Sequence, residues 1–73
     1  MTLRNAEVGK DYIVESINTN DDELNAFLFS LGCYSGEVVT VIAIRRTGMV
    51  ITVKDGRYSI DMNLADAIVV TEK

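Results

Sequence analysis

The stretch from Glu37 to Asp61 reads EVVTVIAIRRTGMVITVKDGRYSID and carries the strongest β signal of the chain. Its first part, Glu37–Ile44, has apolar side chains at both alternating phases, which predicts a strand covered on much of both faces. Its second part, Met49–Lys54, alternates more regularly and predicts a half-buried strand. The polar residues 45–48 between these parts indicate a turn, so the two strands are expected to be neighbours.

An Asp-Gly pair follows the second of these strands. Asp55-Gly56 between two strands favours a type I′ hairpin, because both central residues of that turn need a positive φ. Such a turn pairs Lys54 with Arg57 and places residues 57–61 in a third strand. The sequence therefore predicts three consecutive antiparallel strands.

Upstream of this stretch, residues 21–31 have the periodicity of an amphipathic helix. Apolar residues recur at i, i+3, i+4 and i+7 and lay one stripe along one side, expected to face the core: Leu24, Phe27, Leu28 and Leu31. Asn20 is expected to cap the first turn, with Glu23 completing a capping box. Gly32 is expected to end the helix in the left-handed conformation.

Three further elements complete the order. Residues 12–17 are rich in β-branched types and predict a strand, residues 63–67 predict one helical turn capped by Asn63 with Asp66 at its third position, and residues 68–70 predict a last strand. Five strands are too few for an immunoglobulin-like sandwich, and no crossover helices alternate with them. A mainly all-β, small SH3-like barrel with an inserted helix near 21–31 is expected, as a single domain over residues 1–73.

Composition excludes several functional classes. The 73 residues include 7 basic and 11 acidic side chains, and this net charge of −4 argues against a nucleic-acid partner. The chain has no His and a single Cys, so neither an internal disulfide nor a metal site of imidazole and thiolate is expected. Apolar runs are far shorter than the roughly 20 residues that cross a bilayer, and the N-terminus does not resemble a signal peptide. We expect a cytoplasmic protein without a cofactor.

The candidate chemical groups do not combine into a catalytic site. Asp21, Asp22 and Glu23 follow one another on the helix and point about 100° apart, so helix capping explains them better than a cation site does. Cys33 has no imidazole to activate it and is expected to be a buried, inert thiol. No serine has a histidine partner either, and we expect no enzyme activity.

Surface apolar side chains are more informative. Phe29 falls about 140° from Leu24 on the helix, off the core stripe, and Tyr34 follows shortly after. Either these rings form a partner-binding patch or a neighbouring loop covers them. Three arginines on the expected hairpins either contact an acidic partner or are simply solvated: Arg45, Arg46 and Arg57.

The segment Leu28–Gly36 resembles the Leu-x-x-Leu-Gly-x-x-x-Gly signature of FeoA-like proteins. The resemblance extends over nearly the whole chain, in the order and spacing of short motifs: Leu3, Gly9, residues 12–17, residues 48–53, Gly56, residues 60–62 and residues 66–70. It implies an SH3-like barrel that does not itself carry iron. It also implies an accessory or regulator of FeoB, a membrane permease with a cytoplasmic GTP-binding domain.

The departures from the family pattern concern the partner surface. Phe27 stands where the family usually has a basic residue, Ser35 where it often has proline, and Asn63-Leu64 where basic residues often follow. A more apolar contact through Phe27, Phe29 and Tyr34 would fit these changes. The alternative function is a free-standing interaction module related to the SH3-like C-terminal domain of iron-dependent repressors. Self-association through an exposed apolar patch stays open.

Overall fold

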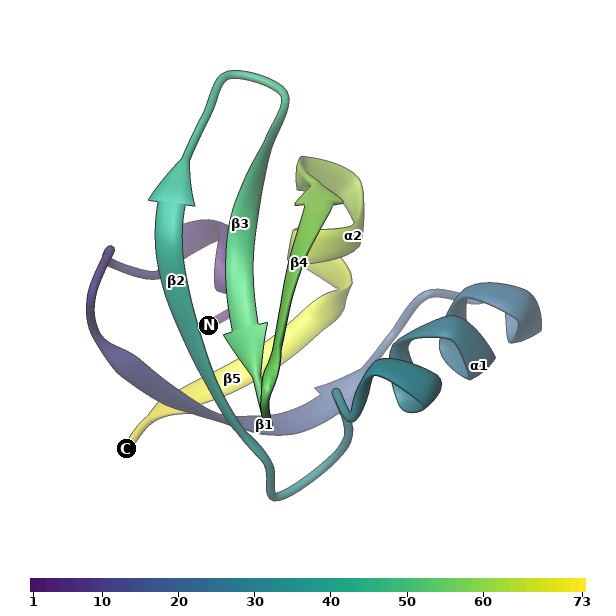
Figure 1. Ribbon diagram of the computed structural model, residues 1–73. Coiled ribbons are helices and arrows are strands. Elements are labelled where there is room, and N and C mark those ends of the chain that lie inside the picture. The colour runs from purple at the N-terminus through teal and green to yellow at the C-terminus, as the bar shows by residue number, and fades with distance from the viewer.

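The computed structural model describes all residues from 1 to 73 and contains five strands and three short helical segments (Figure 1). In chain order these are η1 (Leu3–Asn5, a 3-10 turn), β1 (Asp11–Ile17), α1 (Asp22–Leu31), β2 (Val38–Ile44), β3 (Gly48–Val53), β4 (Gly56–Asp61), α2 (Met62–Ala67) and β5 (Ile68–Glu72). The predicted order of strands and helices is confirmed. Only η1 was not expected.

The five strands form one antiparallel sheet in the order β4-β3-β2-β1-β5. The sheet curls into an SH3-like barrel, and α2 connects the two end strands, β4 and β5 (Figure 1). The N-terminal residues cover part of the outer edge of β5, because Thr2 bridges to Val69 and the Val70 amide donates to the Met1 carbonyl at 2.9 Å. The mainly-β, SH3-like architecture expected from the sequence is confirmed.

The core contains no charged side chain, and its only polar side-chain groups are the Tyr12 hydroxyl and the Cys33 thiol. Alternate residues of the strands point inward, and side chains from η1, α1 and α2 close the ends of the barrel. The central set comprises Leu3, Tyr12, Val14, Leu28, Val39, Val41, Met49, Ile51, Ala65, Ile68 and Val70. Cys33 lies in the same cluster, 1% exposed, and burial raises the pKa of its thiol to about 11. The inert thiol expected from the sequence is therefore a core side chain.

The raised pKa of Cys33 makes stability depend on alkaline pH. The thiol ordinarily titrates near 9.0 and in the folded state near 11, so between these values the folded state holds more protons than the unfolded state. We expect this contribution to be complete below pH 9 and to be lost as the pH rises to 11, by about 2 kcal/mol. Urea unfolding of wild type and Cys33→Ala at several pH values isolates it, since the lysines titrate in both. Parallel pH profiles would contradict the assignment.

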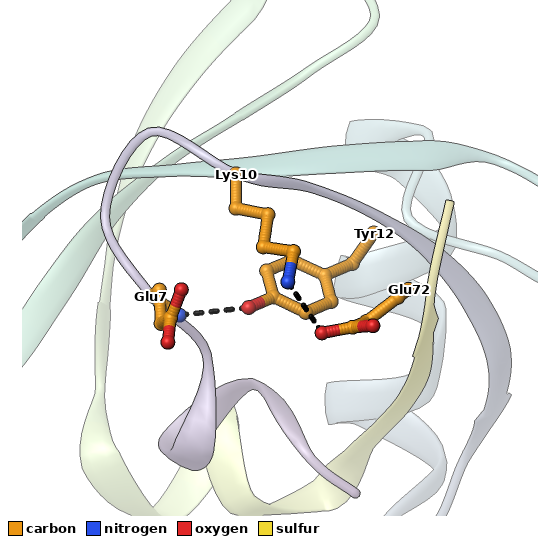
Figure 2. Close-up of polar contacts among 4 residues, drawn as sticks. All are labelled: Glu7, Lys10, Tyr12 and Glu72. Carbon is orange, nitrogen blue, oxygen red and sulfur yellow. Dashed lines mark hydrogen bonds and ion pairs between the residues drawn. The ribbon is translucent and has the colours of Figure 1, made fainter.

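Two side-chain contacts hold residues 7–10, just before β1, against the barrel (Figure 2). Tyr12 is 1% exposed, and its phenol oxygen accepts a hydrogen bond from the Glu7 backbone amide at 2.8 Å. On the exposed surface beside Tyr12, the Lys10 ammonium forms an ion pair with the carboxylate of Glu72 at the end of β5. The ion pair is exposed and stabilises little, so the Tyr12 contact is the stronger of the two.

Removing the Tyr12 hydroxyl tests that contact. Tyr12→Phe leaves the Glu7 amide without its acceptor, and we expect the free energy of unfolding to fall by about 1–2 kcal/mol. Tyr58→Phe is the matched control, because the Tyr58 hydroxyl makes no hydrogen bond within the protein. Chemical denaturation of both variants measures the difference. Equal effects would show that the Glu7 amide gains nothing from Tyr12.

Both helix caps differ from the prediction by one or two residues. Asp21, not Asn20, caps α1, and its carboxylate accepts from the amides of Glu23 and Leu24 at 2.9 and 3.2 Å. Asn20 instead adopts a left-handed φ of 60°, so the expected capping box with Glu23 is wrong. At α2 the cap is Asp61, not Asn63, and its carboxylate accepts from the Leu64 amide at 2.7 Å. Gly32, with φ 93°, ends α1 as predicted.

The β3–β4 hairpin exists, but its predicted turn type and register are wrong. Val53 pairs with Gly56 and Thr52 with Arg57, so the two loop residues are Lys54 and Asp55, and Lys54 takes the positive φ of 54°. A larger residue at Gly56 would require the Tyr58 ring to move. A Cβ there would lie 2.1 Å from the hydroxyl oxygen of Tyr58.

Candidate partner-binding surface

Helix α1 extends away from the barrel (Figure 1). Its first residues are held by the Asp21 cap, and among its residues only Leu28, near the C-terminal end, is buried in the core. The predicted core stripe is therefore wrong for Leu24 and Phe27, which are 40% and 48% exposed. The helical period identified the apolar side correctly, but the barrel covers only one end of the helix.

Exposed apolar side chains lie on two sides of α1. Phe27 and Phe29 are two residues apart, so they point about 160° away from each other around the helix axis. Phe29 is 66% exposed, and no loop covers it. Leu24 and Phe27 lie on the apolar side of the amphipathic helix, whereas Phe29 lies among its polar residues, and exposed apolar side chains often mark contact sites. We call Leu24, Phe27, Phe29 and Tyr34 the α1 surface.

Tyr34 joins this surface through a contact with Phe29. The two ring centroids lie 4.9 Å apart with an interplanar angle of 34°, an offset geometry favourable for aromatic pairs. The Lys54 ammonium lies 5.3 Å from the Tyr34 ring centroid and 3.2 Å from a Glu37 carboxylate oxygen. Hydrogen bonding to Tyr34, and then to Glu37, raises the pKa of Lys54. The β3–β4 turn thus supports the aromatic pair with a cation.

The structure separates Arg45 and Arg46 from the aromatic residues. Arg45 and Arg46 are exposed in the β2–β3 turn, at the end of the barrel away from α1 (Figure 1). Arg57 is exposed at the start of β4. Sequence reasoning did not identify Lys54, because its contacts come from residues 17 to 22 positions away in the chain. The left-handed backbone that directs Lys54 toward Gly32 and Tyr34 has no glycine or asparagine to signal it.

The remaining candidate groups are not brought together. No cluster of three or more Asp, Glu or Cys side chains is arranged to hold a metal ion. Neither α1 nor α2 has the length and apolar composition of a membrane-spanning helix. The fold and its surface define a small SH3-like barrel with a protruding amphipathic helix that exposes apolar side chains.

Comparison with known proteins gives the family. The FeoA domain model matches residues 1–72, and the chain therefore belongs to the FeoA family. This confirms the resemblance found in the sequence. A search of curated protein sequences finds no match.

Solved structures have the same fold. An iron uptake regulatory protein, FeoA, is 24% identical with a TM-score of 0.89, over 100% of this chain and 97% of that chain. FeoA from Stenotrophomonas maltophilia, solved with zinc and described as a prokaryotic SH3 domain protein, is 25% identical with a TM-score of 0.86, over 97% of this chain and 89% of that chain. A manganese-dependent transcriptional repressor is 19% identical with a TM-score of 0.90, over 100% of this chain and 41% of that chain, and this likeness concerns the fold alone.

Proposed function

We propose that this chain is a single-domain cytoplasmic accessory protein of bacterial ferrous iron uptake, which docks on the GTPase part of a FeoB-type permease. Membership of the FeoA family supports the iron-uptake role. The Stenotrophomonas relative has been proposed as a ferrous iron transport activating factor, which agrees with it. The protein acts by binding and breaks no bond, and its one thiol is buried and protonated at neutral pH.

The observation that carries the docking proposal is the exposure of the α1 surface. Leu24, Phe27 and Phe29 are 40%, 48% and 66% exposed on one protruding helix. The core of the barrel is complete without these three side chains, so folding does not require them to be buried. Amphipathic helices with exposed apolar side chains commonly bind in an apolar groove of a partner. We infer that the permease domain supplies that groove and covers both sides of α1.

Calorimetric titration of the purified protein with the isolated cytoplasmic domain of the permease tests the proposal. We expect a saturable one-to-one isotherm with a negative heat-capacity change, because apolar area leaves water on binding. The titration is repeated with the GDP-bound and GTP-analogue-bound domain. No heat and no complex on gel filtration in either nucleotide state would contradict docking on this partner.

A second candidate is a free-standing interaction module related to the metal-dependent repressors. The likeness of fold to the manganese-dependent repressor favours it. It predicts a repressor or another regulator as the binding partner. An adjacent gene for a large permease with a GTPase motif would favour the first function over this one.

A further inference from the structure

A groove lies on the molecule beside the start of α1. Its volume is about 410 Å³, and it is bounded by the β1–α1 connection on one side and by α2 on the other. Its apolar part consists of Leu24, Leu64 and Ala67, and its carboxylates are Asp61 and Asp66. The remaining lining is amide and hydroxyl side chains. This volume suits a short peptide segment and is too small for a folded domain.

The two walls of the groove are fixed by hydrogen bonds within the protein. The Asn18 amide donates to the Ala67 carbonyl at 2.8 Å and so joins the end of β1 to the end of α2. The Asp21 carboxylate fixes the start of α1, and the Asp61 carboxylate fixes the start of α2. Because these residues are already ordered in the free protein, binding a ligand in the groove carries little additional entropic cost of ordering them.

The charge of the groove has one sign. Two carboxylates line it and no Lys or Arg does. Neither Asp61 nor Asp66 forms an ion pair in the protein, whose ion pairs are Lys10–Glu72 and Lys54–Glu37. Each uses one oxygen locally, Asp61 toward the Leu64 amide and Asp66 toward the Thr2 hydroxyl at 3.2 Å. The groove therefore favours a cationic group and disfavours phosphate or carboxylate.

We propose that this groove binds a short partner segment that carries a lysine or arginine next to an apolar side chain. The cation pairs with Asp61 and Asp66, and the apolar side chain covers Leu24 and Leu64. A divalent metal is a poorer occupant, because no three ligating side chains converge. The inference rests on the proposed docking function. Leu24 belongs to both the groove and the α1 surface, so the segment would be continuous with the partner that covers α1.

Nuclear magnetic resonance titration with defined peptides tests the groove directly. The probe is acetyl-Gly-Lys-Leu-Lys-Leu-Gly-amide, and the two matched peptides replace both lysines by glutamate or both leucines by serine. We expect the first peptide to shift the amides of Asn18, Asn63 and Ala67, and the matched peptides to bind at least three times more weakly. Equal affinity for the glutamate peptide, or shifts confined to other residues, would overturn the proposal.

Asp66→Lys is the corresponding protein variant. Asp66 lies in the last turn of α2, where a cation is favourable for the helix dipole, so we expect α2 to stay folded. Affinity for the lysine peptide should fall about three- to tenfold. Glu7→Lys makes the same charge change on an exposed residue outside the groove and should leave that affinity within twofold. Equal losses in both variants would indicate a net-charge effect and overturn the assignment.

The same variants distinguish this inference from the docking proposal. If Asp66→Lys weakens the lysine peptide and also the permease domain, both stand. If it changes neither while substitutions in α1 abolish domain binding, the groove assignment fails and docking stands. If the lysine peptide binds at the groove but the permease domain never binds, the groove stands and docking on that partner fails.

Discussion

Leu28→Ala is expected to lower the free energy of unfolding by about 2–5 kcal/mol, the usual cost of deleting a buried leucine. Leu28 has no exposed surface and is the only side chain of α1 within the core. A domain of this size is expected to have a total stability of only about 4–11 kcal/mol. The substitution therefore removes a large part of the free energy of unfolding, and we expect α1 to detach from the barrel.

Leu24→Ala is the matched control for this prediction. The residue is also a leucine of α1 and belongs to the same sequence stripe, but it is 40% exposed. Its replacement should cost about 1 kcal/mol, less than that of Leu28, because 40% of its surface is already in water, it lies outside the core cluster and alanine is a strong helix former. Urea denaturation followed by circular dichroism measures both. Similar losses in the two variants would mean that α1 packs along its whole length.

Phe27→Asp and Phe29→Asp are each expected to weaken binding to the permease domain about 30- to 1000-fold. Buried aromatic residues at interfaces commonly contribute 2–4 kcal/mol, and a buried unpaired carboxylate adds a further cost. Because the two rings point to opposite sides of the helix, a large loss in both variants would show that the partner encloses α1. A loss in only one would identify the side that is covered.

Val8→Asp controls for a charge placed on an exposed apolar residue. Val8 is 55% exposed in the segment before β1, which Figure 1 places on the side of the barrel away from α1. Its binding to the permease domain should be unchanged within twofold. None of these side chains belongs to the core, so all three variants should fold. Phe29→Asp also loses the ring contact with Tyr34, so its unfolding midpoint should be lower than that of Val8→Asp, and binding is measured below both midpoints. Docking through α1 is contradicted if Phe27→Asp and Phe29→Asp both bind like Val8→Asp.

The predictable parts of the fold depend on local signals. The period of two in residues 49–53, the glycine at position 32 and the helical period of residues 21–31 each act within a few positions, and each gave the correct element. The capping residues were predicted incorrectly because each helix start offers two good candidates. These are Asn20 and Asp21 for α1, and Asp61 and Asn63 for α2. Which one caps depends on where the preceding strand or turn leaves the backbone.

The binding surface was predictable only in part. Phe29 and Tyr34 were expected to be neighbours, and their rings are in contact. The Lys54 contact depends on the β3–β4 register, which was predicted one residue away from its true position. The groove brings Asn18 together with residues more than forty positions later in the chain, and no local sequence pattern predicts that these segments are neighbours.

The sequence by itself determined the order of the strands and helices, the absence of histidine chemistry and the family, because composition, periodicity and motif spacing are properties of the chain. Only the tertiary structure decided that α1 leaves Leu24 and Phe27 in solvent and that Asp61 and Asp66 line one groove. The physical reason is that the spacing of apolar residues in the sequence predicts which side of a helix is favourable to bury. What covers that side is decided by the packing of distant segments.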